Sequence, residues 1–276
     1  MQKAVKRYMP IFVLPTFCAF ILGFIIPFIM GIWLSFCKFT TVTDAKFIGF
    51  SNYKKAFEDT VFRHSFWYTA LFAVASLIII NAVAFALASA LTKNMRGTNI
   101  FRTIFFMPNL IGGIVLGYIW QLIFNGILEK YGTALALNEW YGFWGLIILV
   151  SWQQIGYMMI IYIAGLQSIP GDVIEAAQID GCSRLGAIRH VLLPILKPGI
   201  ATIAAYGFIS CWNEFLFSFM FISKQNKLTL PVGLKNLVGE FSINYGQLAA
   251  GAVIAVVPTL ILFSYVQKNL VGGLSS

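Results

Sequence analysis

Residues 66–91 read FWYTALFAVASLIIINAVAFALASAL, without a charged side chain from one end to the other. A helix needs about 20 consecutive apolar residues to cross the hydrocarbon core of a bilayer. This run is long enough to cross once, and it predicts a transmembrane helix.

Five further apolar segments have the same character. They are residues 11–36, 103–124, 143–166, 199–222 and 246–266. Of the 276 residues, 59% are hydrophobic and only 11% are charged, whereas a soluble domain has roughly 25% charged residues. The sequence therefore predicts an all-α polytopic membrane protein with six transmembrane helices in one domain over 1–276. Segment 11–36 is too long for the apolar part of a signal peptide, so we expect it to be retained as the first helix.

The orientation is predicted from the first span, because the 19 Lys and Arg residues otherwise divide almost evenly, ten on the side of the termini and nine on the other. Six spans put both termini on the same side, and the first span is preceded by Lys3, Lys6 and Arg7 without an acidic residue. Basic flanks stay in the cytoplasm, so we expect both termini to be cytoplasmic in a plasma or inner membrane. The net charge of +9 suits contact with anionic lipid. The loop 92–102 is short and basic, but no clustered basic patch indicates nucleic acid.

The stretch 167–198 has helical periodicity but is too polar to span. Pro170, with Asp172 and Glu175 in the first turn, predicts the start of a helix. Gly181 predicts its end. A short helix on the face that carries the termini suits docking to another protein.

A second short helix is predicted in the same stretch. Ser183 is a suitable N-terminal cap for it. Pro194 and Pro198 are expected to end it before the fifth span, because proline interrupts a helix.

The stretch also contains a spaced motif. It reads Glu175-Ala176-Ala177, then two residues, Asp180-Gly181, then nine residues, and Val191-Leu192-Leu193-Pro194. The pattern resembles the EAA loop of ABC importer permeases, from which only Val191 departs. Independently of that resemblance, small alanines let a helix lie close to a partner, Gly181 permits a turn, and Glu175 offers a charge to a basic group. The alternative is an ordinary surface helix pair, in which the alanines serve helix propensity, Glu175 serves the helix dipole and Asp180 only caps the helix.

The resemblance extends to the carbohydrate branch of these permeases. Phe47-Ile48-Gly49-Phe50-Ser51-Asn52-Tyr53 is similar to the first permease of the usual pair, whereas Trp212-Asn213-Glu214-Phe215 is similar to the second. The resemblance implies the membrane subunit of an ATP-driven importer for a carbohydrate or sugar derivative. It implies as partners a second permease chain (a paralogue or another copy), two cytoplasmic ATPase subunits and an extracytoplasmic solute-binding protein. By the same resemblance, the 167–198 loop couples ATPase movement to the spans through Glu175, Ala176, Ala177, Asp180, Gly181, Leu193 and Pro194.

The chain lacks the residues for chemistry of its own. No Gly-x-x-x-x-Gly-Lys-Ser/Thr loop is present, so ATP and Mg²⁺ are expected on the partner ATPase and no cofactor on this chain. No catalytic constellation and no metal-ligand spacing occurs. The alternative function is a secondary transporter or channel, but such proteins usually carry several ionisable groups inside the membrane and internal repeats.

Only one acidic residue, Glu214, lies within a predicted span. Ionisable groups there are costly and usually face a cavity or a partner. Glu214 with Trp212 and Asn213 is therefore a candidate for the solute path, as are Gln121 and Gln153. The alternative for Glu214 is a hydrogen bond to another helix, and for the glutamines a place beside interfacial tryptophans.

Two other features concern packing. Asn81 is expected to bond to a neighbouring helix. Gly112, Gly113 and Gly117 follow Pro108 and allow either a close helix contact or a hinge in the third span.

Overall fold

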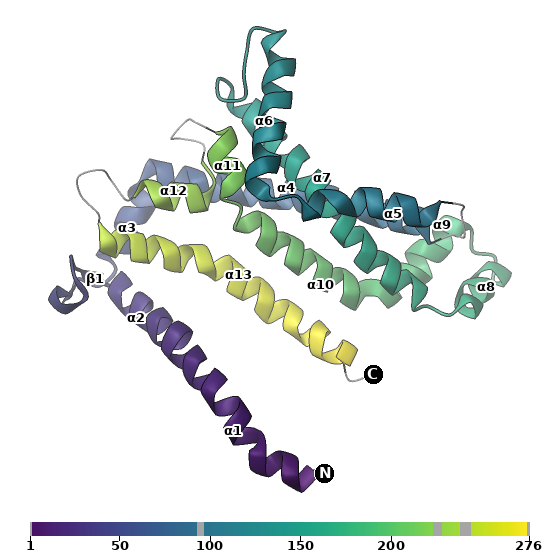
Figure 1. The fold of residues 1–276 in the computed structure, drawn as a ribbon, viewed down its shortest axis with the longest axis horizontal. Helices are drawn as coiled ribbons and strands as arrows, with labels where there is room; N and C mark the ends of the chain where they lie inside the picture. Colours follow the sequence, from purple (N-terminus) through teal and green to yellow (C-terminus); the bar gives the residue numbers. More distant parts are fainter. Residues whose placement is uncertain (1, 93–96, 223–227, 238–243, 275–276) are drawn as a thin grey trace. The chain divides into compact units, whose positions relative to one another are not determined.

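The computed structural model describes residues 2–92, 97–222, 228–237 and 244–274, and these are almost wholly helical (Figure 1). Residues 93–96 of the short basic loop lie outside the described residues. Among the described residues, five helices are long and apolar enough to cross a membrane, and a bent pair of helices supplies a sixth crossing if it counts as one span. The chain divides into two compact units, Met1–Arg63 with Leu234–Val257 and His64–Gly233 with Pro258–Ser276. A single domain over 1–276 stays a prediction.

The first unit begins with one long apolar helix. Its spanning part is Ile11–Ser35, which confirms the first predicted segment. The elements of the unit are α1 (Gln2–Phe20), the π turn η1 (Ile21–Ile25), α2 (Ile26–Ser35), β1 (Cys37–Lys38), the 3-10 turn η2 (Val42–Asp44), β2 (Lys46–Phe47), α3 (Ser51–Glu58) and the first part of α13 (Tyr245–Leu274).

The loop after the first span is folded by polar side chains. Asn52 is 2% exposed, and its amide donates to the carbonyls of Ser35 (2.9 Å) and Cys37 (2.8 Å). Ser35 is the last residue of α2 and Cys37 the first of β1, so the amide satisfies one carbonyl at the helix end and one at the start of the strand. The Asp44 carboxylate accepts hydrogen bonds from the backbone N–H groups of Thr41 (2.9 Å) and Thr40 (3.0 Å), which lower the pKa of Asp44 below its usual value.

The second unit contains the remaining helices. They are α4 (Thr60–Leu91, whose first turn belongs to the first unit), α5 (Thr98–Phe106), the 3-10 turn η3 (Met107–Leu110), α6 (Gly113–Glu129), α7 (Glu139–Gln167), α8 (Gly171–Ile179), α9 (Arg184–Ala187), the π turn η4 (Ile188–Leu192), α10 (Leu193–Trp212), α11 (Leu216–Phe221) and α12 (Leu230–Asn236), with the second part of α13. Long helices confirm the predicted segments 66–91, 143–166 and 246–266.

The third predicted segment is not one straight helix. Thr98–Leu110 and Gly113–Glu129 meet at an angle of 100° (Figure 1). Pro108 lies in the 3-10 turn before the bend, and Gly112 has extended backbone. A Cβ on Gly113 would lie 2.8 Å from Leu216 Cδ2, and one on Gly117 would lie 2.6 Å from Met220 Sδ. The close contact is therefore made by Gly113 and Gly117, while the bend falls just before them.

The fifth predicted segment begins earlier than expected. We predicted that Pro194 and Pro198 would end a short helix, but this was wrong, because the chain is helical without interruption from α9 through η4 into α10. In the π turn the Leu193 N–H bonds to the Ile188 carbonyl, five residues back. The π turn shifts the pattern of backbone hydrogen bonds just before Pro194, which has no backbone N–H to donate. The helix continues past both prolines.

Helix α7 is held against its neighbours by one polar and one small residue. The Tyr162 hydroxyl donates to Asn81 Oδ1 (2.6 Å) on α4, which confirms the predicted role of Asn81. Gly156 lies against α5, where a Cβ would collide with the carbonyl of Phe105 and lie 2.8 Å from Phe106 Cα. Backbone atoms cannot swing aside as a side chain can, so this contact admits only glycine.

We expect Gly156→Ala to destabilise the protein by about 1–3 kcal/mol through overpacking. The measurement is the thermal midpoint of the purified protein in detergent. The matched control is Gly126→Ala on α6, where a Cβ would meet nothing within 4 Å. That change should leave the midpoint unchanged or raise it, since glycine within a helix is unfavourable. Equal midpoints for the two variants would contradict the close approach of α5 to α7.

Candidate functional site

The polar stretch after α7 is built around a glycine stop. Helix α8 begins at Gly171 and ends at Ile179. Gly181 follows with φ +86°, in the left-handed region. The N–H of Cys182 bonds back to the Ala177 carbonyl (3.0 Å), and that of Asp180 to the Ala176 carbonyl (2.9 Å). These bonds satisfy carbonyls at the helix end in the way that a left-handed glycine allows, which confirms Gly181 as the stop.

Ser183 begins the next helix, as predicted. Its hydroxyl accepts from the Gly186 N–H (3.1 Å), and its carbonyl accepts from the Ala187 N–H (2.8 Å). From there the backbone is helical through η4 into α10, with half-buried Leu193 and exposed Pro194 at the start of α10. Two motif residues therefore lie on the helix that enters the fifth span.

Helix α8 has two distinct faces. Ala177 is 5% exposed and faces the chain itself, so it is not available to a partner as expected. Glu175 lies in the second turn and not in the first. The outward face carries Asp172, Glu175, Ala176 and Ile179, which lie at i, i+3, i+4 and i+7 and share one side of a helix.

Ile179 is 85% exposed and was missed in the sequence. It looks like an ordinary apolar helix position there, and only the helical register relative to Ala177 puts it on the outer face. A single exposed apolar side chain is common on protein surfaces, and this one lies on the same helix face as Asp172 and Glu175.

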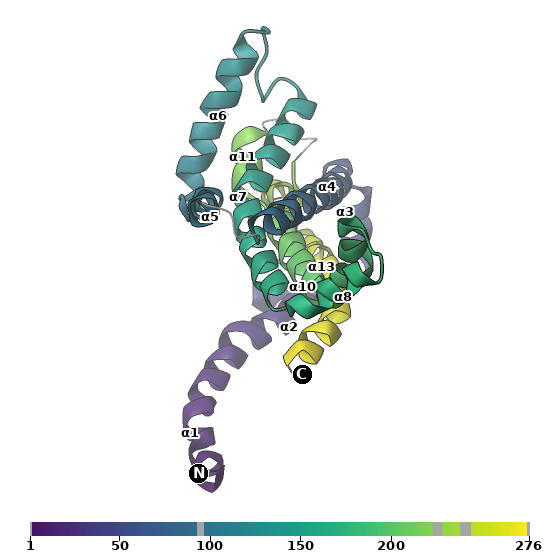
Figure 2. The same cartoon turned by 90° about the vertical axis from the view of Figure 1, so that its right-hand side faces the viewer.

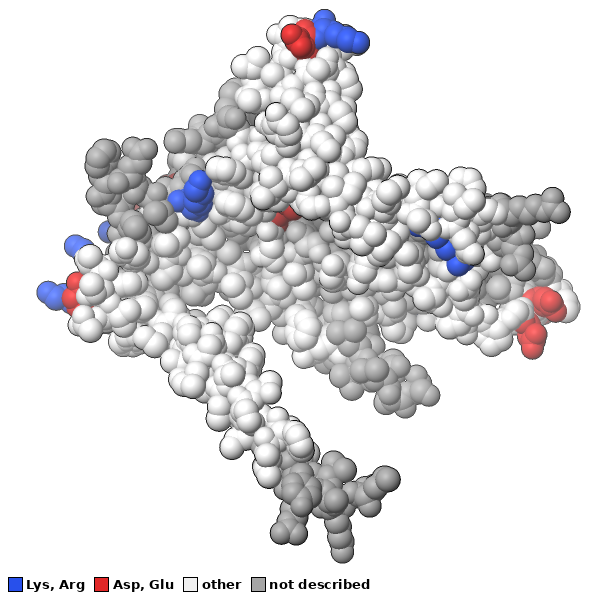
Figure 3. All heavy atoms as spheres, in the orientation of Figure 1, with Lys and Arg blue, Asp and Glu red and all other residues white. Residues whose placement is uncertain are grey.

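The outer face of α8 is negatively charged. Asp172, Glu175 and Asp180 are exposed, and Figure 3 shows acidic atoms gathered over α8. Their side chains make no hydrogen bond or ion pair with the side chains that the structure describes. Such a surface complements a basic partner surface.

The fifth span is interrupted near its far end. Residues Asn213 to Phe215 separate α10 from α11, so Glu214 does not lie inside a helix as expected. The Asn213 amide donates to the Ile209 carbonyl (2.9 Å), and Glu214 Oε1 accepts from the Phe217 N–H (2.8 Å). The Glu214 carbonyl accepts from the Thr229 hydroxyl (2.9 Å). The Glu214 carboxylate and the Thr229 hydroxyl thus satisfy two backbone groups that the break leaves, whereas the Ile209 carbonyl also keeps its backbone bond from the Asn213 N–H (3.1 Å).

Trp212 is packed inside the helices. It is 3% exposed, and its ring lies 5.5 Å from that of Phe66 and 5.4 Å from that of Phe208, measured between centroids. A buried ring has no free face for a sugar, so in this structure Trp212 supports the break and does not line a path. Asn213 is exposed and Glu214 is half-buried.

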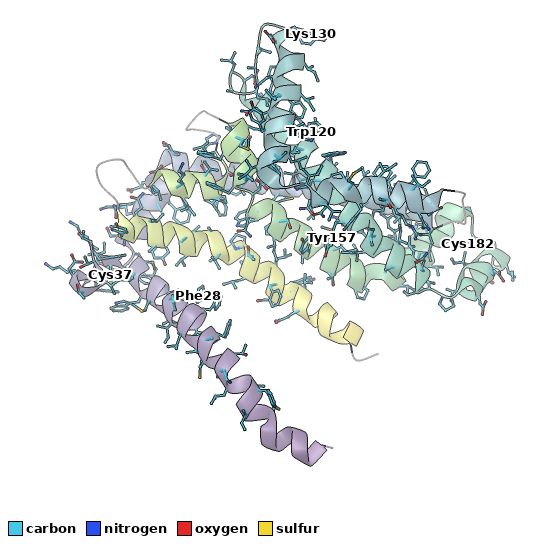
Figure 4. The ribbon with its side chains drawn as sticks, in the orientation of Figure 1. Phe28, Cys37, Trp120, Lys130, Tyr157 and Cys182 are labelled. Atoms are coloured by element: carbon cyan, nitrogen blue, oxygen red, sulfur yellow. The ribbon has the colours of Figure 1, made fainter. Side chains whose placement is uncertain are left out.

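Gln121 and Gln153 adjoin one aromatic pair. Trp120 (Figure 4) and Trp152 have ring centroids 5.3 Å apart, and each is followed by one of the glutamines. The Gln121 amide donates to the Met220 carbonyl of α11 (2.8 Å). Next to Gln153, Gln154 keeps a buried Oε1 without a hydrogen-bond partner. Helix α11 packs against both α6 and α7 (Figures 1 and 2). The glutamines of α6 and α7 therefore lie in the same group of packed helices as the break before α11.

No metal centre is visible in the described parts of the chain, since they hold no group of three or more His, Cys, Asp or Glu side chains that could bind an ion.

Residues 82–275 match the family model described as binding-protein-dependent transport system inner membrane component. The match includes α8, η4 and the break between α10 and α11. A curated relative, the probable starch degradation products transport system permease protein AmyD of Thermoanaerobacterium thermosulfurigenes, is 41% identical over 213 residues, covering 74% of this chain and 72% of the relative. The arabinooligosaccharides transport system permease protein AraP of Bacillus subtilis is 28% identical over 264 residues, covering 91% of this chain and 84% of the relative.

The fold is also similar to that of a solved structure. A chain of the bacterial alginate ABC transporter, in complex with its alginate pentasaccharide-bound periplasmic protein, superposes with a TM-score of 0.78 at 19% identity and covers 96% of this chain and 95% of that chain.

Proposed function

Because the chain belongs to the family of binding-protein-dependent transport system inner membrane components, we infer that it is the transmembrane subunit of an ABC importer for a carbohydrate or sugar derivative. The family match over most of the chain carries this conclusion, and the sugar-transporting relatives support the substrate class. The chain is a multi-pass permease and not an enzyme. ATP and Mg²⁺ are bound and used by partner ATPase subunits.

We propose that α8 docks on an ATPase subunit. Its outer face offers an exposed apolar side chain, Ile179, beside the carboxylates of Asp172 and Glu175. Ile179 supplies buried apolar area on docking, and the carboxylates favour a basic partner surface. Ala176 leaves room for close approach. Ala177 acts on the inner side, where it lets α8 lie against its own chain.

The link from α8 to the membrane favours transmission of movement. After the turn at Gly181, the backbone is one uninterrupted helix from Arg184 through Leu193 and Pro194 to Trp212. A continuous helix moves as a rigid element, so displacement at its outer end reaches the fifth span. Two ATPase subunits would move two such loops, one on this chain and one on a second permease chain, either a paralogue or another copy.

The break at Asn213 to Phe215 is our proposed contact with the solute. Discontinuous helices at membrane depth commonly form binding sites in transporters, because non-helical backbone lines a cavity there. The exposed amide of Asn213, the carboxylate of Glu214 and the amides of Gln121 and Gln153 are suitable partners for sugar hydroxyl groups. An extracytoplasmic binding protein would deliver the sugar to this path, as the alginate complex suggests by its composition.

Copurification tests the central conclusion. The full chain, tagged and extracted from the membrane, should bring down an ATPase subunit. Ile179→Ser should reduce the ATPase recovered, since the apolar contact is lost while an 85% exposed side chain contributes little to the fold. Ile179→Val is the matched control and should retain most of it. Autonomous ion-coupled uptake in liposomes, without any ATPase, would overturn the importer assignment.

We expect Gly181→Leu to lower transport while leaving expression and membrane insertion unchanged. A Cβ there would meet nothing within 4 Å, so the cost arises from φ +86°, which disfavours a residue with a Cβ by roughly 1–2 kcal/mol. The strain would displace α8 from its docking position. Gly181→Asn is the matched variant, because asparagine adopts the left-handed region more readily, and it should transport better than the leucine variant. Normal uptake by Gly181→Leu would contradict a coupling role.

Two variants of Glu214 distinguish a role of its charge in binding the solute from a role of its hydrogen bond in holding the break. Glu214→Gln keeps an oxygen acceptor for the Phe217 N–H but removes the charge, so the thermal midpoint should hold while the apparent affinity for sugar changes. Glu214→Leu removes both and should lower the midpoint, since an unpaired buried N–H is costly. The measurement is the sugar-dependent ATPase activity of the purified complex beside its thermal midpoint. Unchanged sugar dependence in Glu214→Gln would restrict Glu214 to holding the break.

A further inference from the structure

Five aromatic rings form a continuous row where the first span ends. This aromatic row consists of Trp33, Phe36, Phe47, Phe50 and Tyr53. Trp33 stacks on Phe47 (5.6 Å between centroids), Phe47 adjoins Phe36 (6.4 Å), Phe36 meets Phe50 edge-on (5.2 Å), and Phe50 adjoins Tyr53 (5.8 Å). Trp33, Phe47 and Phe50 remain 57%, 64% and 72% exposed. The row is thus ordered by its own contacts but uncovered on one side.

The row is fixed to the end of the span. The Asn52 amide bonds to the carbonyls of Ser35 and Cys37, and the Ser35 and Tyr53 hydroxyls are 2.7 Å apart. Cys37 is fully buried, and side chains gather around it where α2 meets β1 (Figure 4). The row therefore keeps its position relative to the last turn of α2.

Two lysines face each other beside the row. In the antiparallel pair β1–β2, Lys38 lies directly opposite Lys46. Both are exposed, and neither forms a salt bridge with a described residue. Like charges directly opposite one another destabilise a strand pair. An external anion bound by the two ammonium groups would reduce this repulsion.

The acidic residues of the same loop are engaged elsewhere. The Asp44 carboxylate accepts from the backbone of Thr40 and Thr41. The Asp59 carboxylate accepts from the first turn of α4, and Glu58 lies 3.8 Å from Lys54. Among the described residues, none of these carboxylates forms an ion pair with Lys38 or Lys46.

We propose that the aromatic row lies in the interfacial layer of the bilayer and that Lys38 and Lys46 bind the headgroups of anionic phospholipids. Continuity with the membrane span places it there, because the apolar stretch ends at Ser35, between Trp33 and Phe36. Aromatic rings concentrate at the level of the headgroups. Charge complementarity selects the headgroup, since two ammonium groups that form no salt bridge with a described residue attract an anionic phosphate.

The hairpin thus acts as an anchor at this end of the first helix. The rings sit among the glycerol and upper acyl groups, while the two ammonium groups reach the phosphates. This role is independent of which solute the protein carries.

Quenching of Trp33 fluorescence tests the position of the row. The full chain, with the subunits that copurify, is placed in vesicles of equal parts phosphatidylcholine and phosphatidylglycerol, in which one lipid at a time is brominated near the headgroup end of its acyl chain. The chain has 7 tryptophans, so the signal of Trp33 is the difference between the wild type and Trp33→Phe. We expect strong quenching of this difference signal, and stronger quenching by brominated phosphatidylglycerol. A Trp33 signal that neither brominated lipid quenches would overturn the proposal. That is the result expected if a protein, and not lipid, covers the aromatic row.

Lysine variants test the headgroup preference. Lys38→Gln with Lys46→Gln should remove the preference for brominated phosphatidylglycerol at Trp33 while leaving quenching by brominated phosphatidylcholine in place. The matched control is Lys54→Gln with Lys55→Gln, which removes the same charge from the same loop but from α3. It should keep the preference. A preference that survives loss of Lys38 and Lys46, or that the control abolishes equally, would refute a specific role for the opposed pair.

Discussion

Backbone polar groups inside a membrane find no water, so every interruption of a helix must be satisfied by the protein itself. The break between α10 and α11 illustrates this requirement. The Glu214 carboxylate serves an N–H at the start of α11, and the Thr229 hydroxyl serves the Glu214 carbonyl. The Gln121 amide reaches the Met220 carbonyl at the other end of α11. Of the polar residues that we propose as contacts for the solute, Asn213 and Glu214 thus lie where regular helix is absent, and Gln121 bonds to the helix that follows.

Outside the bilayer the same requirement is easily met, and the chain there uses local devices. Gly181 ends α8 in the left-handed region, and Ser183 begins α9 two residues later. These devices are local to the turn, and Asp172, Glu175, Ala176 and Ile179 of α8 remain exposed. In the proposed function, the ATPase subunit docks on this face, where Ile179 is exposed beside carboxylates that form no ion pair with a described residue. The tight turn also fixes α8 relative to the helix that enters the fifth span.

Features encoded locally could be predicted from the sequence, whereas those that depend on distant partners could not. Gly181, Ser183 and Asn81 were correctly assigned, since a left-handed glycine, a serine cap and a lone amide in a span each have one common use. The sequence allowed a hinge or a close contact at Gly112, Gly113 and Gly117, and the structure has both, with the bend at Pro108 to Gly112 and the contact with α11 at Gly113 and Gly117. Trp212 and Ala177 were expected to meet ligands or partners, but Phe66 with Phe208 and the chain's own surface cover them. The continuous helix past Pro194 depends on a π turn that leaves no clear trace in the sequence.

The two interruptions in the spans are mechanically connected. Gly113 and Gly117 bring α6 against Leu216 and Met220 of α11, and Gln121 adds a hydrogen bond between the same helices. Helices α6 and α11 are therefore closely packed and joined by a hydrogen bond. In the proposed mechanism, α10 is displaced from its cytoplasmic end by the ATPase. Since α6 holds α11, the displacement of α10 is taken up between α10 and α11, at residues Asn213 to Phe215. The residues that we assign to the solute thus lie at the joint where the motion of the coupling helix is taken up, so that movement and release of the sugar occur at one place.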